Sequence, residues 1–391
     1  MTVERVRHLV GIGVDATAEL ADAAAPDVLR LENLDTDVRP LGEALEISKN
    51  EVSEDRANSY LPFFGADELR MAATGHVTAL SGVSYDWRTQ CIITAGGCNG
   101  ILNTLLALLS PGDKVVMTDP IYVGLINRVR LAGGAPVFVP FRAVNSAWRL
   151  DLAAFRQAVT KKTRAFLMMS PSMPSGAVLN REEWEAVADA CIAADAWMIY
   201  DAAMERILYD GAPHIHPASL DGMASRTITV GTVSKEQRMI GWRVGWIVGP
   251  AEAMRDIGLV CISNVVCQVG IAQRAAAVAL RRGEESFRAA VAEWQARLDH
   301  IREELSSLPL MPCSGGWSVL LDVEPFGLTS IEASKRLMEV GHIAATPMKN
   351  WGSERSDRFV RLVFSNEPVP RLRGLQERVE RALGKSSSAR K

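Results

Sequence analysis

The chain has 391 residues, enough for two or three packed units with a substantial core. Its 43 Lys and Arg residues nearly balance its 46 Asp and Glu residues, giving a formal net charge of −3. The basic excess that phosphate-backbone binding needs is therefore absent, which disfavours a nucleic-acid partner. A hydrophobic content of 48% and a charged content of 23% are typical of globular proteins and exclude a disordered or collagen-like chain.

The beginning of the chain and its cysteines indicate a cellular compartment. The first residues, MTVERVRH, carry charges where a signal peptide has its apolar run, and no later stretch reaches the ~18 apolar residues of a membrane span. The six cysteines form no C-x-x-C pair, and scattered thiols of this kind are usually small buried hydrophobes. His214 and His216, beside Pro217, fit a loop better than a metal site. We expect a cytoplasmic protein with no membrane partner, disulfide framework or bound metal.

Short apolar runs alternate with helical patterns between residues 91 and 248. The helical run Ile101–Leu109 ends at a Ser-Pro-Gly-Asp turn, and Asn180 is a candidate N-cap for a helix that continues through Ala193. Nearly all of the apolar runs are hydrophobic on both faces, as in buried parallel strands. Strands and helices in alternation predict an α/β doubly wound sheet. The seven expected strands are Cys91–Thr94, Val115–Thr118, Pro136–Val139, Ala165–Met169, Trp197–Tyr200, Thr227–Val230 and Trp246–Val248.

The pattern changes after about residue 270. A long charged helix, Glu284–Ser306, is followed by a Gly-rich strand region at Ser314–Trp317 and by another strand at Phe359–Phe364. These elements predict a second, smaller α+β domain. The predicted organisation is an N-terminal segment, 1–45, that packs on the small domain, a large domain, 46–280, and the small domain, 281–391. We expect the polar tail at 386–391 to be frayed.

The densest group of functional residue types is GTVSKEQRMIGWRVG at residues 231–245. Two hydroxyl groups, a lysine and an arginine, with glycines that allow the backbone to approach a ligand, suit an anionic group beside a reactive amine. The segment resembles the S-x-S-K-x-x-x-x-x-G-x-R-x-G signature of fold-type I pyridoxal-phosphate (PLP) enzymes, class I/II aminotransferase family, with Thr232 in place of the first Ser. A serine–lysine hydrolase is disfavoured because its S-x-x-K motif would need Ser at position 232.

The resemblance assigns roles to this segment and to two strand ends. It implies that Lys235 forms a Schiff base with pyridoxal 5'-phosphate and acts as general base, while Thr232, Ser234 and Arg243 hold the phosphate. Asp201 follows the strand Trp197–Tyr200, and the aspartate at this place in the family keeps the pyridine nitrogen protonated.

Further matches complete the implied site. The Gly-rich turn at 94–100 opens a helix, and the amides of Gly97 and Cys98 are the implied phosphate contacts. Tyr122 matches the aromatic residue that stacks on the pyridine ring, and Tyr60 matches the tyrosine that reaches the cofactor phosphate of the neighbouring subunit. In the strand FVRLVF, Arg361 matches the arginine that binds the substrate α-carboxylate. A buried ion pair is the alternative for Arg361.

The chain departs from the family pattern at two hydrogen-bond donors to the phenolic oxygen of the cofactor. Methionine stands at both positions, Met173 and Met204. Loss of both donors should raise the pKa of the internal aldimine. The alternative is that Ser172, Ser175 or Tyr200 supplies a substitute donor.

The resemblance implies the fold-type I architecture, with a mostly parallel seven-stranded sheet in the large domain and a smaller α+β domain. It implies a homodimeric PLP-dependent aminotransferase that moves an amino group between an amino acid and a 2-oxo acid. The alternative is a PLP-dependent lyase or oxidase of the same fold, which Met173 and Met204 favour. A ligand sensor is disfavoured because no basic or DNA-binding region flanks the motifs. Substrate specificity stays open, including whether Arg39 faces a substrate side chain.

Overall fold

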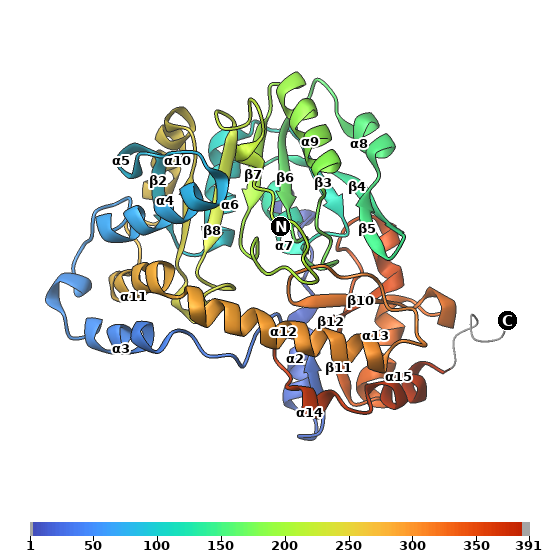
Figure 1. The fold of residues 1–391 in the computed structure, drawn as a ribbon. Coiled ribbons are helices and arrows are strands. Elements are labelled where there is room, and N and C mark those ends of the chain that lie inside the picture. Colours follow the sequence, from blue (N-terminus) through green and yellow to red (C-terminus); the bar gives the residue numbers. More distant parts are fainter. Residues whose placement is uncertain (1–2, 385–391) are drawn as a thin grey trace.

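The computed structural model describes residues 3–384, apart from the side chains of Glu4 and Arg5, and contains two β-sheets flanked by helices (Figure 1). The predicted fraying of 386–391 lies outside these residues. Among the described residues, no helix is both long and apolar enough to cross a membrane.

The larger sheet has eight strands in the order β2-β9-β8-β7-β6-β3-β4-β5. All seven predicted strands are present. The additional strand, β5, forms an antiparallel hairpin with β4 through Asn145 and Ser146, which both have positive φ, as hairpin turns of two residues require. The pairs between β3, β4, β6, β7 and β8 are parallel, but β9 runs antiparallel to both of its neighbours. The strands are β2 (Cys91–Thr94), β3 (Lys114–Asp119), β4 (Ala135–Val144), β5 (Ala147–Leu150), β6 (Thr163–Met169), β7 (Trp197–Asp201), β8 (Thr227–Thr232) and β9 (Gly245–Val248).

Helices cover both faces of this sheet, so the doubly wound arrangement is confirmed. Alternate residues of β3 point to opposite faces: Val115 packs in the cluster with helices α6, α7 and α10, whereas Val116 packs with α8 and α9. Asn180 caps α9 through a capping box with Glu183, as its position predicts. The helices on this part of the chain are α3 (Gly42–Glu51), α4 (Asp67–Ser81), α5 (Trp87–Gln90), α6 (Gly97–Leu108), α7 (Val123–Leu131), α8 (Leu152–Ala158), α9 (Arg181–Ala193), α10 (Ala251–Asn264) and α11 (Gly270–Arg282).

The smaller sheet has the order β1-β11-β12-β10 and joins the two ends of the chain. β1 (Leu29–Leu31) pairs in parallel with β11 (Ile343–Pro347), and β12 (Phe359–Val363) lies between β11 and β10 (Ser318–Asp322). The long helix α12 runs along this part of the molecule (Figure 1). The domain boundaries at 45 and 280 stay a prediction. The other helices here include α2 (Val14–Asp22), α12 (Glu284–Glu304), α13 (Ser330–Glu339), α14 (Val369–Leu372) and α15 (Leu375–Leu383).

The expected strand region at Ser314–Trp317 does not form a regular strand: β10 begins only at Ser318, and Gly315 makes an isolated antiparallel bridge to Leu208. Gly315 and Gly316 instead let this segment pass close to the large sheet. A Cβ atom on Gly315 would lie 2.4 Å from Pro171 Cγ, and Gly316 has a φ of +76°. Close approach and left-handed geometry both favour glycine and interrupt a regular strand.

Candidate active site

A cavity of about 310 Å³ lies where the carboxyl ends of β7 and β8 face the smaller sheet. Functional side chains are expected at this edge of a parallel sheet. Tyr60, which is 82% exposed, lies outside the cavity. The other candidates from the sequence all line it: Gly97, Cys98, Tyr122, Asp201, Thr232, Ser234, Lys235, Arg243 and Arg361.

Lys235 follows β8 and points into the cavity. Its Nζ donates a hydrogen bond to the Leu34 carbonyl at 2.7 Å and lies 4.9 Å from the centre of the Trp317 ring. Burial lowers the pKa of the Lys235 amine to about 8, against an ordinary value of 10.5. The neutral, nucleophilic form of this amine is therefore more populated near neutral pH than that of a surface lysine.

One end of the cavity has the features of an anion site. Thr232 Oγ1 lies 2.9 Å from Ser234 Oγ and donates to the Val244 carbonyl at 2.8 Å, while Arg243 Nη1 lies 3.4 Å from Ser234 Oγ. Gly97 begins the twelve-residue helix α6, whose first N–H groups have no partner within the helix. We call this group, with Gly96 and Cys98, the phosphate end.

Gly96 makes room for this arrangement. Its φ is +86°, and a Cβ atom there would lie 2.7 Å from Arg243 Nη2. A side chain at position 96 would therefore occupy the space of the guanidinium group and strain the backbone.

Asp201, the last residue of β7, is a buried carboxylate. Its Oδ1 accepts a hydrogen bond from the Ala203 amide at 3.1 Å, and within residues 3–384 it forms no ion pair. Burial raises the pKa of the Asp201 carboxyl to about 7. A protonated nitrogen of a bound ligand would supply the cation that this carboxylate lacks.

Arg361, on β12, lies at the opposite end and is only 1% exposed. Its Nη2 donates to the Glu32 carbonyl and to Thr346 Oγ1, and its Nη1 lies 3.6 Å from Met173 Sδ. Burial lowers the pKa of the guanidinium to about 10. No described carboxylate pairs with it, so the alternative of a buried ion pair is not realised and the cation is free to bind an anion.

The comparisons with known proteins agree with this geometry. A family model described as "Aminotransferase class I and II" matches residues 28–375. The chain belongs to this aminotransferase family.

Curated relatives and solved structures extend the match over most of the chain. This aminotransferase is 33% identical to the arginine–pyruvate transaminase AruH of Pseudomonas aeruginosa over 79% of each chain. It is 32% identical to the aspartate aminotransferase of Pyrococcus abyssi over 83% of this chain and 84% of that protein. The structure of N-succinyldiaminopimelate aminotransferase from Mycobacterium tuberculosis superposes with a TM-score of 0.90 at 29% identity, covering 97% of this chain and 99% of the other.

The enzyme therefore transfers an amino group between an amino acid and a 2-oxo acid, as PLP-dependent aminotransferases do. The lyase or oxidase alternative is not favoured. The fold-type I architecture expected from the sequence is confirmed.

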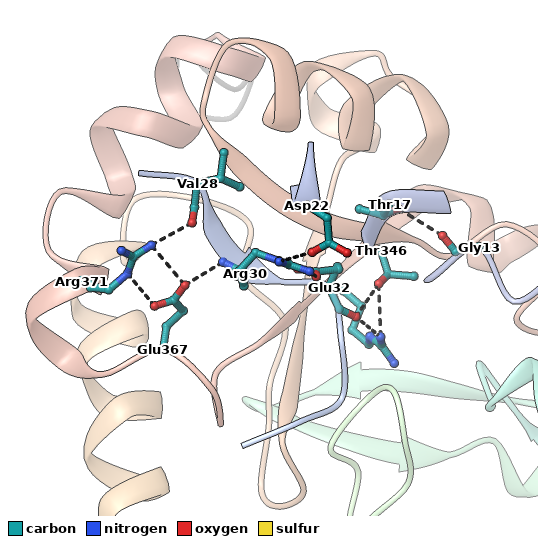
Figure 2. A network of polar contacts seen from close by, with 10 residues as sticks. Gly13, Thr17, Asp22, Val28, Arg30, Glu32, Thr346, Glu367 and Arg371 are labelled. Atoms are coloured by element: carbon teal, nitrogen blue, oxygen red, sulfur yellow. Dashed lines mark hydrogen bonds and ion pairs between the residues drawn. The ribbon is translucent and has the colours of Figure 1, made fainter. Parts of the chain in front are cut away.

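A polar network that includes Asp22, Arg30, Glu32 and Thr346 was not predicted from the sequence (Figure 2), and it also holds Arg361. The Glu32 carbonyl accepts from Arg361 and also from Thr346 Oγ1, at 2.9 Å for the latter. The fully buried Glu32 carboxylate accepts from Arg30 Nε at 2.8 Å, and Arg30 Nη1 pairs with Asp22 at 2.7 Å. The charged residues on either side of Leu31 in an otherwise apolar strand are the signal that could have revealed this network.

The aromatic wall of the aminotransferase cavity comprises Tyr122 and Trp351. Their ring centres lie 5.6 Å apart, with planes inclined by 54°, and the Arg361 guanidinium lies 4.9 Å from the Trp351 ring centre. Tyr122 was predicted as the stacking residue, whereas Trp351 was missed because it follows no recognisable motif.

Met173 and Met204 both line the cavity of the aminotransferase. The proposed substitutes do not line it. Tyr200 donates instead to the Ser170 carbonyl at 3.1 Å, and Ser175 Oγ donates to the Ser172 carbonyl at 3.4 Å. The expectation of a raised cofactor pKa therefore stays open to test.

Ile12, before α2, and Val14 and Asp15, the first two residues of α2, are further lining residues that the sequence did not reveal. Asn33 and Leu34, after β1, also line the cavity. Arg39 does not, and its carbonyl accepts from Arg238 Nε at 3.4 Å.

Proposed function

We propose that this aminotransferase binds pyridoxal 5'-phosphate in the cavity and that Lys235 is the amine that attaches to it. The observation that carries the proposal is the convergence of three groups in one cavity. These are an amine of lowered pKa, an anion site at a helix N-terminus, and a buried carboxylate without a cation partner. These groups match the aldehyde, phosphate and pyridine nitrogen of PLP in chemical type.

Different residues of the chain would bind different parts of the cofactor. Thr232, Ser234, Arg243 and the amides of Gly97 and Cys98 would hold the phosphate. Asp201 would face the ring nitrogen and Tyr122 the ring face. When bound, PLP supplies an electron sink that makes the Cα–H bond of the amino acid acidic.

The substrate would be oriented by the opposite end of the cavity. Arg361 would bind the α-carboxylate with its guanidinium fork, which directs the Cα–H bond toward Lys235. Lys235 Nζ would take the proton from Cα in the first half-reaction and return a proton to Cα of the product amino acid in the second. In the proposed organisation, the large domain supplies Lys235 and the small domain supplies Arg361.

Reduction with borohydride and peptide mass spectrometry tests the assignment. The protein is loaded with PLP, reduced and digested. We expect the cofactor mass on the peptide that contains Lys235, and no such label in Lys235→Ala. Labelling at another lysine, or an unlabelled peptide in protein that has bound PLP, would overturn the proposal.

We also propose a homodimer with shared active sites, in which Tyr60 reaches the cofactor phosphate of the partner. Large apolar side chains that follow Tyr60 in the chain or lie on and beside helices α10 and α11 are exposed: Phe63 50%, Leu259 64% and Val269 53%. The backbone at Ala57 lies directly against Gly270, which places these segments side by side.

A complementation experiment tests the shared site. Tyr60→Ala and Lys235→Ala are each expected to lower activity, and a mixed dimer is expected to recover one intact site. Mixing without any recovery, in dimers shown to exchange subunits, would contradict the shared site.

We further propose that the enzyme is cytoplasmic. All six cysteines are free in the structure, which suits a reducing compartment. Fractionation of cells that express the native protein, with recovery outside the cytosolic fraction, would overturn this.

A further inference from the structure

The charges of the cavity bear on which amino acid it accepts. Within the described chain, three cationic side chains line the cavity: Lys235, Arg243 and Arg361. The proposed function uses all three, for the cofactor aldehyde, the phosphate and the α-carboxylate. No described cation remains for a second carboxylate on the substrate side chain.

The substrate side chain would instead meet the segment before α2 and the first turn of that helix, which are firmly anchored. The Val10 amide and carbonyl both bond to the Asn127 side chain of α7, at 3.2 and 2.7 Å. The Ile12 carbonyl accepts from Trp351 Nε1 at 3.2 Å. Gly13 then turns the chain into α2, and its carbonyl accepts from Thr17 Oγ1 (Figure 2). The segment therefore crosses from the large sheet's helix α7 to the loop at Trp351.

This anchored segment presents an apolar wall that ends in a carboxylate. Ile12 and Val14 line the cavity together with Leu34 and Ile240, and the exposed Asp15 lines it at the solvent side. Asp15 and Tyr122 line the same cavity; burial is the main cause of the raised pKa of the Tyr122 hydroxyl, and the Asp15 carboxylate makes a minor contribution in the same direction. Asp15 is exposed whereas these four apolar residues are half-buried, so a side chain that extends along this wall toward solvent meets apolar groups before the negative charge.

We infer that the amino donor has a long side chain, apolar near Cα, that ends in a positive charge. This inference rests on the proposed function, because it takes Arg361 as the group that binds the α-carboxylate. A terminal cation gains a partner in Asp15, whereas a side-chain carboxylate would lie against apolar groups and a like charge.

Two pairs of nearly isosteric amino acids test the inference. The PLP-loaded enzyme is mixed with arginine or its neutral analogue citrulline, and with glutamate or its neutral analogue glutamine. The half-reaction is followed by the absorbance of the cofactor. We expect the second-order rate constant for arginine to exceed that for citrulline about three- to fivefold, as for an exposed charge pair. We expect glutamine to exceed glutamate by about tenfold or more.

Variants of α2 test whether the Asp15 carboxylate causes the preference for arginine over citrulline. In Asp15→Asn, and in Asp15→Ser as a second replacement, the arginine-to-citrulline ratio should fall to about one. Glu19→Gln removes an exposed carboxylate from the same helix outside the cavity and should leave the ratio as it is. Raised ionic strength should reduce the ratio in the unchanged enzyme.

The outcomes separate the two proposals. Equal rates for glutamate and glutamine, or an arginine-to-citrulline ratio that Asp15→Asn does not change, would overturn the inference while amino transfer continues. A different result would overturn the proposed function itself: no amino acid reacts with the PLP-loaded enzyme, and Lys235→Ala gives the same cofactor absorbance as the unchanged enzyme.

Discussion

The two ends of the cavity are built in different ways. At the phosphate end, Thr232, Ser234 and Arg243 come from one stretch of fifteen residues, and Gly97 begins the neighbouring helix. At the end that holds Arg361, which we call the carboxylate end, Glu32 directly follows β1, Thr346 lies on β11 and Arg361 lies on β12, and these strands meet only in the folded sheet. The residues of the phosphate end are therefore close together in the sequence, whereas the pairing of distant strands brings together those of the carboxylate end.

The difference also concerns how charge is arranged. At the phosphate end, Arg243 Nη1 donates to the Ile240 carbonyl at 2.7 Å and lies 3.4 Å from Ser234 Oγ. At the carboxylate end, the buried Arg361 contacts neutral oxygens and a thioether, and the nearest negative charge of the network, on Glu32, is already held by Arg30. This arrangement surrounds the guanidinium without occupying its anion-binding position.

The largest expected effect concerns how the reactivity of Lys235, between the two ends, depends on pH. Its pKa of about 8, against 10.5 for an ordinary lysine, makes the neutral amine about 300-fold more abundant below pH 8. The rate at which cofactor-free protein binds PLP covalently should therefore rise with pH and level off above about 8. Stopped-flow absorbance measures this profile, and a midpoint near 10.5 would contradict a buried, desolvated amine.

Arg361→Lys breaks the carboxylate end. Lysine keeps the charge but loses the planar fork, so we expect the KM for the amino acid to rise about a hundredfold, as for a disrupted buried charge pair. The dissociation constant of PLP should change much less, because the phosphate end is intact. Steady-state kinetics and cofactor titration measure the two quantities, and equal losses in both would show that the ends are not independent.

Gly96→Ala breaks the phosphate end. The Cβ atom would meet Arg243 at 2.7 Å in a backbone of φ +86°, so PLP affinity should fall about tenfold. Gly112→Ala is a matched control, because Gly112 has the same φ but no atom within 4 Å of its Cβ position. Fluorescence titration with PLP measures the difference, and similar losses in both variants would assign the effect to backbone strain alone.

Glu32→Gln tests the carboxylate end without changing Arg361, because it disturbs that residue only through its neighbour. The neutral amide weakens the bond to Arg30 and shifts the carbonyl that positions the guanidinium, so the KM should rise about fivefold, with kcat little changed. Glu51→Gln is the control, since Glu51 is also buried and paired with an arginine, Arg274, away from the cavity. A fall in kcat and melting temperature without a change in KM would indicate a purely structural role.

Met173→Asn gives the smallest expected effect. A hydrogen bond to the phenolic oxygen of PLP, worth about 0.7 kcal/mol, should lower the pKa seen in the visible spectrum of the bound cofactor by about half a unit. Met173→Leu adds no donor and should not lower it. A titration of absorbance against pH measures both variants, and equal shifts in the two would exclude the hydrogen bond as the cause.

Much of the fold and of the phosphate end could be predicted because their signals are local. Apolar runs identified all seven expected strands, and Asn180 with Glu183 identified a helix start. The short strand β5 was missed because its turn depends on the positive φ of Asn145 and Ser146 rather than on glycine.

The unpredicted parts depend on contacts between distant segments. The charges of Arg30 and Glu32 mark this strand as unusual, but they do not show that the Glu32 carbonyl meets Arg361, 329 positions later. The same holds for Ile12, whose place in the cavity follows from its bond to Trp351. Pairing of β1 with β11 and docking of the first residues on α7 are tertiary events, which residue spacing does not record.

Arg361 and Asp201 leave two buried charges of opposite sign without an ion-pair partner among the described residues, and this affects more than catalysis. A ligand that neutralises either charge binds the folded chain and not the unfolded one, so it must raise the melting temperature. Simple monocarboxylates can therefore be ranked by thermal shift before any turnover is measured. The melting temperature then shows which acids bind in the cavity.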